Sequence, residues 1–261
     1  MTELVAAGNG GKPDITVRDL TMAYGSFVLM HDMNFTINHG DVFIIMGGSG
    51  SGKSTLLRHL IGLNQPARGD IFYGEQNFTQ ADASHRRQLL RRIGVLFQSG
   101  ALWGPLTLAE NVGLLLEEYT DLTPAETGEV AALKLALVGL KGFEDYYPSQ
   151  ISGGMQKRAG LARAMALDPA ILFFDEPSSG LDPISARLLD ELILDLRDSL
   201  GSTIVVVTHD LASIFTIGNN SIFLDGDRKI ISAAGPPKEL LAHTQDPALR
   251  NFLTRGGAEH S

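Results

Sequence analysis

The spacing of apolar and polar residues divides the chain into alternating strand-like and helix-like segments. Short alternating or continuous apolar runs predict strands at residues 15–20, 28–30, 34–37, 69–73, 93–97, 171–174, 203–207, 221–224 and 229–233, and residues 42–46 form another. Helical spacing or turn signals predict helices at residues 53–61, 84–92, 184–200, 237–242 and 247–252. This alternation predicts an α/β fold.

The ends of the chain differ in composition from this regular pattern. Residues 1–12 are rich in Gly and Ala, and we expect a disordered tail there. The strands before residue 42, broken by Gly25 and Gly40, are expected to form an antiparallel β subdomain. A domain over residues 13–241 and a C-terminal extension over residues 242–261 complete the expected organisation.

Two helix starts stand out between the predicted strands. Thr107 and Thr123 are each followed three residues later by glutamate, which is the capping-box pattern, and Pro124 occupies the first helical position of the second. A third helix begins at Ser152. Together they predict a helical insertion over about residues 107–166.

The stretch after the strand at residues 42–46 has the pattern of a phosphate-binding loop. Glycines let such a loop fold around an anion, and the following helix directs its N-terminal N–H groups at the same charge. Lys53 is expected to reach the β- and γ-phosphates of a nucleotide and Ser54 to hold Mg²⁺. The loop comprises Gly47, Gly48, Ser49, Gly50, Ser51, Gly52, Lys53 and Ser54, and Thr55 follows it. The alternative, a flexible Gly/Ser turn, does not explain the full match.

Polar residues follow several of the buried strands, at the edge where α/β sheets bind ligands. Gln98 follows one strand, Asp175 and Glu176 follow the next, and His209 follows a third. Asp175 can hold Mg²⁺ and Glu176 can polarise a water molecule towards a γ-phosphate. Taken alone, Gln98 is an ordinary solvated glutamine and His209 a structural histidine.

Three further features are each a weak indication of function when taken alone. Tyr24 lies in a predicted turn and can stack on adenine, although a surface or core tyrosine is the commoner case. Ser152, Gly153 and Gly154 open a helix and can hold an anion or serve as an ordinary cap. Asp182 closes a tight turn before a helix.

The composition argues against some kinds of partner and some kinds of site. Thirty acidic and 21 basic residues give a net charge of −9, which argues against sequence-independent binding to nucleic acid or to an anionic membrane surface. The chain has no cysteine, so disulfides and thiolate metal sites are excluded. We find no signal peptide and no apolar run long enough to span a membrane, so a membrane role is expected to go through a partner.

The chain resembles the nucleotide-binding subunit of ATP-binding cassette (ABC) transporters in the order of its motifs. These motifs are the phosphate loop, Gln98, Ser152-Gly153-Gly154, Asp175-Glu176 and His209. The resemblance covers about residues 14–235. It implies a P-loop NTPase core sheet with an antiparallel β subdomain and a helical insertion.

The same resemblance implies roles for the candidate residues. Tyr24 becomes the aromatic residue that stacks on adenine, and Gln98 a magnesium ligand and sensor that joins the site to a permease. Ser152 to Gly154 become the signature that contacts the γ-phosphate held by a second copy, and Asp182 part of a loop crossing between the copies. ATP and Mg²⁺ are the implied cofactors, and a head-to-tail dimer enclosing two ATP molecules is the implied active form.

Met155 stands where most members have glutamine. With residues 96–103, this makes the chain similar to the ATPase of MCE-linked lipid transporters of the Mla type, which move phospholipid between bacterial membranes. That resemblance implies a multispan permease, an MCE-domain protein and often a small STAS-domain protein as partners. It places the chain on the cytoplasmic face of the inner membrane, and it implies that residues 243–255 reach the neighbouring ATPase.

The sequence alone also allows other functions to be considered. The chain can be a cassette ATPase for another cargo, since the motor does not touch the cargo. A soluble cassette acting on ribosomes or DNA usually has two cassettes or a coiled-coil insert, and this chain has neither. A non-catalytic ATP-binding module is expected to lack Glu176 or His209, and a P-loop kinase to lack Ser152-Gly153-Gly154.

Overall fold

The computed structural model describes residues 12–254, so all of the expected N-terminal tail except Lys12 lies outside the described residues. The chain divides into two compact units. Among the described residues, the first unit contains residues 12–90 and 203–254, and the second contains residues 91–202.

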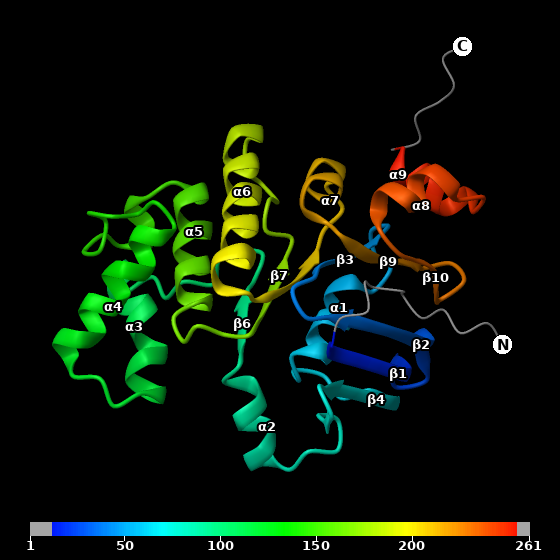
Figure 1. Ribbon diagram of the computed structural model, residues 1–261, viewed down its shortest axis with the longest axis horizontal. Helices are drawn as coiled ribbons and strands as arrows, with labels where there is room; N and C mark the ends of the chain where they lie inside the picture. The colour runs from blue at the N-terminus through cyan, green and yellow to red at the C-terminus, as the bar shows by residue number, and fades with distance from the viewer. Residues whose placement is uncertain (1–11, 255–261) are drawn as a thin grey trace. The chain divides into compact units, whose positions relative to one another are not determined.

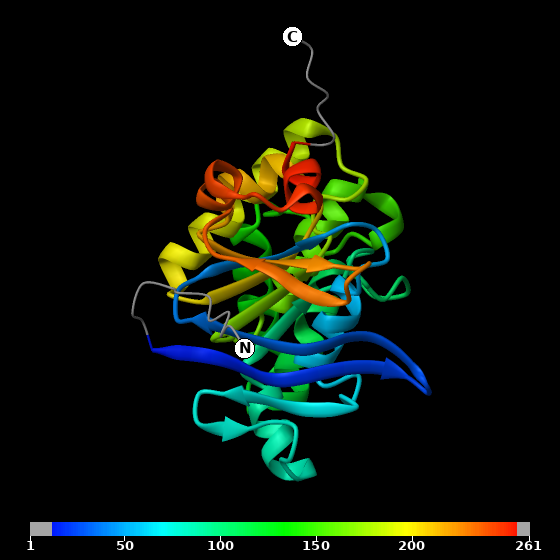
Figure 2. The same ribbon diagram turned by 90° about the vertical axis from the view of Figure 1, so that its right-hand side faces the viewer.

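The first unit contains an antiparallel sheet of four strands in the order β2-β1-β4-β5 (Figures 1 and 2). The strands are β1 (Pro13–Tyr24), β2 (Phe27–Asn38), β4 (Arg68–Tyr73) and β5 (Gln76–Asn77). Figure 2 shows β1 and β2 as two long paired strands. The expected antiparallel subdomain is therefore present.

β1 and β2 are longer than the sequence pattern predicts, and Tyr24 is the last residue of β1 rather than part of a turn. The apolar alternation fails near Asp19 and Asp32 because both have positive φ and the β1–β2 register shifts beside Asp19. The Asp19 N–H donates to Asn34 Oδ1 at 3.0 Å, so a side chain satisfies the backbone at the irregularity.

The first unit also holds four strands of a mixed sheet: β3 (Val42–Gly47), β8 (Thr203–Val207), β9 (Asn220–Asp225) and β10 (Ile230–Ala234). β3 lies between β8 and β9 and is parallel to both, whereas β10 is antiparallel to β9. Every residue of β3 and β8 is buried, as their unbroken apolar runs predict. Because Ile45 pairs with Val207, the carboxyl ends of β3 and β8 meet at one edge.

The helices described in this unit are α1 (Lys53–Leu60), α2 (Ala83–Leu90), α7 (Leu211–Ile217), α8 (Pro237–His243) and α9 (Pro247–Leu253). The helix predicted at residues 84–92 ends at Leu90, two residues early. The two C-terminal helices are confirmed. The ring of Phe252 in α9 lies 5.3 Å from that of Phe223 in β9, and Leu249 and Leu253 are buried, so α9 packs on its own chain.

The second unit pairs β6 (Ile93–Leu96) in parallel with β7 (Ile171–Asp175). Its helices are α3 (Leu108–Tyr119), α4 (Pro124–Leu137), the short 3-10 helix η1 (Pro148–Gln150), α5 (Gly153–Ala164) and α6 (Pro183–Leu200). Figure 1 shows α3, α4 and α5 gathered together in green. Both predicted capping boxes are formed, at Thr107 with Glu110 and at Thr123 with Glu126.

Candidate nucleotide site

The predicted phosphate loop connects β3 to α1 in the first unit. Gly47 ends β3, and a Cβ at this position would stand 2.6 Å from Ser51 Oγ and 2.7 Å from the carbonyl oxygen of Leu224. Only glycine fits there without moving the backbone. Gly52, with φ of 94°, is the N-cap of α1, so the chain turns directly from the loop into the helix.

Lys53 closes this loop on itself. Its Nζ donates to the carbonyl oxygens of Gly47 at 2.9 Å and Gly48 at 2.8 Å, and the side chain is buried. Ser51 Oγ is also buried, and it has no hydrogen-bond partner within residues 12–254. A buried hydroxyl without a partner fits a polar ligand, and the N-terminus of α1 favours an anionic one.

The remaining loop residues flank this centre. Gly48, Ser49 and Gly50 are exposed, whereas Ser54 and Thr55 lie half-buried in the first turn of α1. Tyr24 Oη lies 3.4 Å from Thr55 Oγ1, and Tyr24 is 54% exposed. The aromatic ring at the end of β1 is therefore anchored beside the phosphate loop and remains open to solvent, as stacking on a base requires.

His209 follows β8 at the same edge of the sheet as the phosphate loop. The Thr208 N–H donates to the carbonyl oxygen of Ile45 at 3.4 Å, which carries the β3–β8 pairing up to the residue before His209. His209 is exposed, and Asp210 caps α7 by accepting from the Ala212 N–H at 3.1 Å. The structure thus places Tyr24 beside Thr55, and His209 at the edge of the sheet where the loop leaves β3.

The other candidates belong to the second unit. Asp175 is the buried last residue of β7, and Glu176 follows it with φ of 50°. Gln98, which follows β6 by two residues, donates through Nε2 to Ser179 Oγ at 3.2 Å. The parallel pairing of β6 with β7 places Gln98 next to the turn after Glu176, where this hydrogen bond forms.

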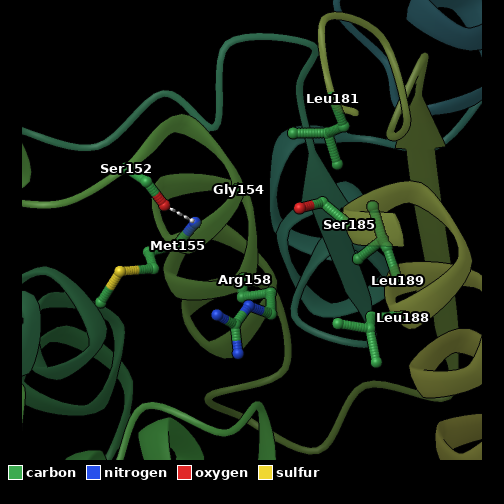
Figure 3. Close-up of a pocket in the computed structure, with 8 residues that line it drawn as sticks. All are labelled: Ser152, Gly154, Met155, Arg158, Leu181, Ser185, Leu188 and Leu189. Carbon is green, nitrogen blue, oxygen red and sulfur yellow. Dashed lines mark hydrogen bonds between the residues drawn. The ribbon is translucent and has the colours of Figure 1, made fainter. Parts of the chain in front are cut away.

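Ser152 is the N-cap of α5, where its Oγ accepts from the Met155 N–H at 3.3 Å, and Gly153 and Gly154 form the first turn. Figure 3 shows a pocket with α5 on one side and α6 on the other, lined by Ser152, Gly154, Met155, Arg158, Leu181, Ser185, Leu188 and Leu189. Its volume is about 50 Å³, far below the roughly 300–1,000 Å³ of ordinary ligand pockets. A nucleotide does not fit inside this pocket, so Ser152 can contact one only from the surface.

Asp182 is the N-cap of α6 and accepts from the Ile184 and Ser185 N–H groups. Its Oδ2 also accepts from Ser185 Oγ at 2.6 Å. Two hydrogen bonds from Ser185 lower the pKa of Asp182, the one from the hydroxyl more than the one from the N–H. The carboxylate therefore stays ionised at the positive end of α6. The turn expected to cross between two copies is thus held by its own helix.

The expected magnesium ligands are a hydroxyl, an amide and a carboxylate, from Ser54, Gln98 and Asp175. These are hard oxygen donors, which suit Mg²⁺ when phosphate and water oxygens complete its coordination. Within the part of the chain that the structure describes, no three His, Cys, Asp or Glu side chains gather into a metal site of their own. The chemistry of these side chains therefore suits Mg²⁺.

Sequence reasoning missed two residues that support these candidates. Lys157 in α5 donates to the backbone carbonyls of Glu176 and Pro177. Gly226, after β9, lies against Ser51. A lysine between polar residues and a glycine between two predicted strands carry no local signal, because their importance depends on what the fold places opposite them.

Comparison with known proteins defines the class. The family model described as "ABC transporter" matches residues 30–179. The chain is 41% identical over 239 residues to the probable ribonucleotide transport ATP-binding protein mkl of Mycobacterium tuberculosis, covering 92% of this chain and 66% of that protein. It therefore spans about two thirds of the length of this mycobacterial relative.

A second relative is matched over more of its length. The intermembrane phospholipid transport system ATP-binding protein MlaF of Escherichia coli strain K12 is 38% identical over 239 residues, covering 92% of this chain and 88% of MlaF. The Haemophilus influenzae protein of the same description is 37% identical, with 89% of its length covered.

Solved structures agree on the fold. The dimeric post-hydrolysis state of the ATP-binding cassette MJ0796, bound to ADP and Pi, superposes with a TM-score of 0.77 and 30% identity, covering 85% of this chain and 98% of that one. The cassette cbiO1 of Clostridium perfringens, part of the ABC transporter complex cbiONQ, gives a TM-score of 0.81 and 26% identity, covering 89% and 92%. The chain belongs to the ABC transporter ATPase family.

None of the helices between Lys12 and Thr254 is long and apolar enough to cross a membrane.

Proposed function

We propose that this chain is the ATP-hydrolysing motor of a membrane transporter that moves phospholipid between bacterial membranes and so maintains outer-membrane lipid asymmetry. The observation that carries the proposal is the match to MlaF, which extends over 88% of that protein and 92% of this chain. The match to mkl supports a second cargo, a ribonucleotide, but covers only 66% of that protein.

The motor works through residues at the ends of buried strands. Lys53 and the N–H groups that open α1 bind the phosphates, Tyr24 stacks on adenine, and His209 donates a hydrogen bond towards the γ-phosphate. Glu176 accepts a proton from the attacking water. Ser54, Gln98 and Asp175 would hold Mg²⁺, which when bound would supply positive charge to offset the charge of the phosphates.

Two copies are needed for turnover. Ser152, Gly153 and Gly154 present the N-terminus of α5 at the surface, where they complete the site of a second copy in a head-to-tail dimer. Asp182 lies on the loop that crosses between the copies. ATP thereby stabilises the closed pair, and hydrolysis releases it, so the motor alternates between two populations.

The proposed partners follow from this role. A multispan permease carries the motion into the membrane and an MCE-domain protein receives the lipid, while a small STAS-domain protein binds the ATPase. The chain then lies on the cytoplasmic face of the inner membrane and contacts the membrane only through the permease. Its charge of −9 supports the absence of nucleic acid among its partners.

Affinity purification from native membranes in mild detergent, with mass spectrometry of proteins and lipids, tests the proposal. We expect a permease, an MCE-domain protein and phospholipid. A different permease with its own binding protein would keep the motor and reject the lipid cargo, and recovery of ribosomes would reject transport altogether.

The composite site has its own test. Ser152→Arg places a long cation where the second copy's phosphate is expected. ATP-dependent dimerisation, followed by light scattering, should be lost while a single chain still binds ATP. A variant that dimerises and hydrolyses ATP normally would refute the shared site.

A further inference from the structure

Lys157 is a buried lysine on α5, the helix that begins with Ser152-Gly153-Gly154. It is 7% exposed, and its Nζ donates to the carbonyl oxygen of Pro177 at 2.8 Å and to that of Glu176 at 3.2 Å. Both acceptors lie in the turn that follows β7. One side chain therefore connects the start of α5 with the backbone that carries the proposed catalytic glutamate.

This turn has an unusual backbone. Glu176 has φ of 50°, which residues other than glycine rarely adopt. Pro177 has no N–H with which to hold its own position. The Ser179 N–H donates to the carbonyl oxygen of Glu176 at 3.2 Å, and Gln98 reaches Ser179. An uncommon conformation persists only where the surroundings fix it, and Lys157 supplies two of the fixing bonds.

The charge of Lys157 makes these bonds necessary. Burial lowers the pKa of the Lys157 ammonium, and the negative charge of Glu176 acts in the opposite direction. A buried ammonium group needs acceptors to replace water. The carbonyl oxygens of Glu176 and Pro177 are such acceptors, so Lys157 and the turn stabilise each other.

We propose that Lys157 is a positioning residue for ATP hydrolysis, which fixes the Glu176–Pro177 backbone to α5 and thereby orients the Glu176 side chain towards the attacking water. The proposal rests on the proposed function, because it takes Glu176 as the base. It adds a mechanical consequence. α5 presents Ser152 to the second copy's nucleotide and holds the glutamate of its own site, so a displacement of α5 changes the orientation of that glutamate.

The test compares substitutions of buried lysines in the full-length chain. Lys157→Met keeps the aliphatic stem and removes the donors, whereas Lys157→Arg keeps donors and charge. Lys134→Met is the matched control, because Lys134 is 5% exposed, lies on α4 and pairs with Asp168 at 2.5 Å, away from the turn after β7. Each variant is measured for kcat and KM of ATP hydrolysis, for ATP affinity with a fluorescent analogue, and for Tm.

We expect Lys157→Met to lower kcat roughly ten- to hundredfold, with KM and ATP affinity changed by less than about threefold. Lys157→Arg should recover a large part of the lost kcat. Lys134→Met should lower Tm but keep the wild-type kcat. If Lys157→Met does not fold, Lys157→Leu, which also lacks a hydrogen-bond donor, takes its place under the same criteria.

A wild-type kcat in a folded Lys157→Met or Lys157→Leu variant would overturn the proposal. Equal losses of kcat in Lys157→Met and Lys134→Met would also overturn it, because a general loss of stability would then explain both. Failure of the proposed function gives a different result: rejection of the phospholipid cargo would leave these kcat ratios unchanged, and rejection of the motor itself would appear as a wild-type chain that does not hydrolyse ATP.

Discussion

Gly226 lies against Ser51 so closely that a Cβ on Gly226 would stand 3.3 Å from the Cα of Ser51. Gly226 follows β9, and Ser51 lies in the phosphate loop. The turn between β9 and β10 therefore supports the loop from one side. Lys229 in the same turn places its Nζ 4.6 Å from the ring centre of Phe27, three residues after Tyr24. One hairpin thus borders both parts of the candidate nucleotide site in the first unit.

Gly226→Ala should weaken ATP binding. The added methyl group overpacks the contact with Ser51, and about 1 kcal/mol of strain in the loop corresponds to roughly fivefold lower affinity. Titration with a fluorescent ATP analogue measures the effect. Gly128→Ala is the matched control, because a Cβ there meets nothing within 4 Å and the residue lies on α4. Unchanged affinity in Gly226→Ala would show that the turn does not support the loop.

Asn111→Ala should release the loop that carries Trp103. Asn111 is fully buried in α3, accepts from the Trp103 N–H at 2.7 Å, and donates to the carbonyl oxygens of Trp103, Leu106 and Thr107 at 2.9–3.1 Å. Leaving these groups without a partner should lower the free energy of unfolding by about 2 kcal/mol.

Trp103 is the only tryptophan in the chain and is 62% exposed, so its fluorescence reports on this loop alone. We expect its anisotropy to fall in Asn111→Ala and to stay unchanged in Asn251→Ala, which alters an exposed residue of α9. Wild-type anisotropy and stability in Asn111→Ala would mean that the loop is held by other contacts.

The stability of the chain should depend on pH through His59 in α1. Burial lowers the pKa of His59 from its ordinary value of 6.5, although the Thr55 carbonyl, 2.8 Å from Nδ1, acts in the opposite direction. Below pH 6.5 the unfolded chain therefore binds a proton that the folded chain does not. The contribution of neutral His59 to stability is complete above pH 6.5 and is lost as the pH falls towards the lowered pKa.

Thermal unfolding of the wild type and of His59→Gln, measured between pH 7.5 and 5, checks this sign. The Tm of the wild type should fall more steeply on acidification than that of the variant. Parallel curves would remove His59 from the acid sensitivity of the chain.

Removal of the last helix should destabilise the chain itself. Leu249 and Leu253 of α9 are buried, and the loss of a buried leucine side chain costs about 2–5 kcal/mol. Truncation before Gln245 should therefore lower Tm in the isolated chain, whereas truncation after Thr254 should not. A truncated chain with wild-type Tm would free residues 245–254 for the proposed contact with a neighbouring ATPase, since α9 would then contribute nothing to its own fold.

Local signals were sufficient for most elements of the fold. The apolar runs of β3 and β8, the capping boxes at Thr107 and Thr123, and the end of α6 at Gly201 each depend on residues close in sequence, and the structure confirms them. The lengths of β1 and β2 do not, because the alternation breaks at the irregularity near Asp19 and Asp32, whereas the two strands remain paired on both sides of it.

The residues of the candidate site likewise differ in how well the sequence predicts them. The glycines around Lys53 and the carboxylates after β7 form short motifs whose chemistry is visible in sequence. Lys157, Asn111 and Gly226 have no such signal, since their partners lie in other elements or well outside any motif. Hydrogen bonds and packing across elements are fixed by the fold as a whole, and only the structure reveals them.

We hold that Glu176 is the base for ATP hydrolysis in this chain, and phosphate release by Glu176→Gln is the decisive measurement. The amide keeps the shape of the side chain but cannot accept the proton of the attacking water. Purified wild-type chain and variant are given ATP and Mg²⁺, and phosphate release, ATP affinity and dimerisation are measured together. We predict a loss of kcat of roughly a hundredfold or more, with ATP affinity retained and an ATP-dependent dimer that persists. Near-normal phosphate release by the variant would contradict this account.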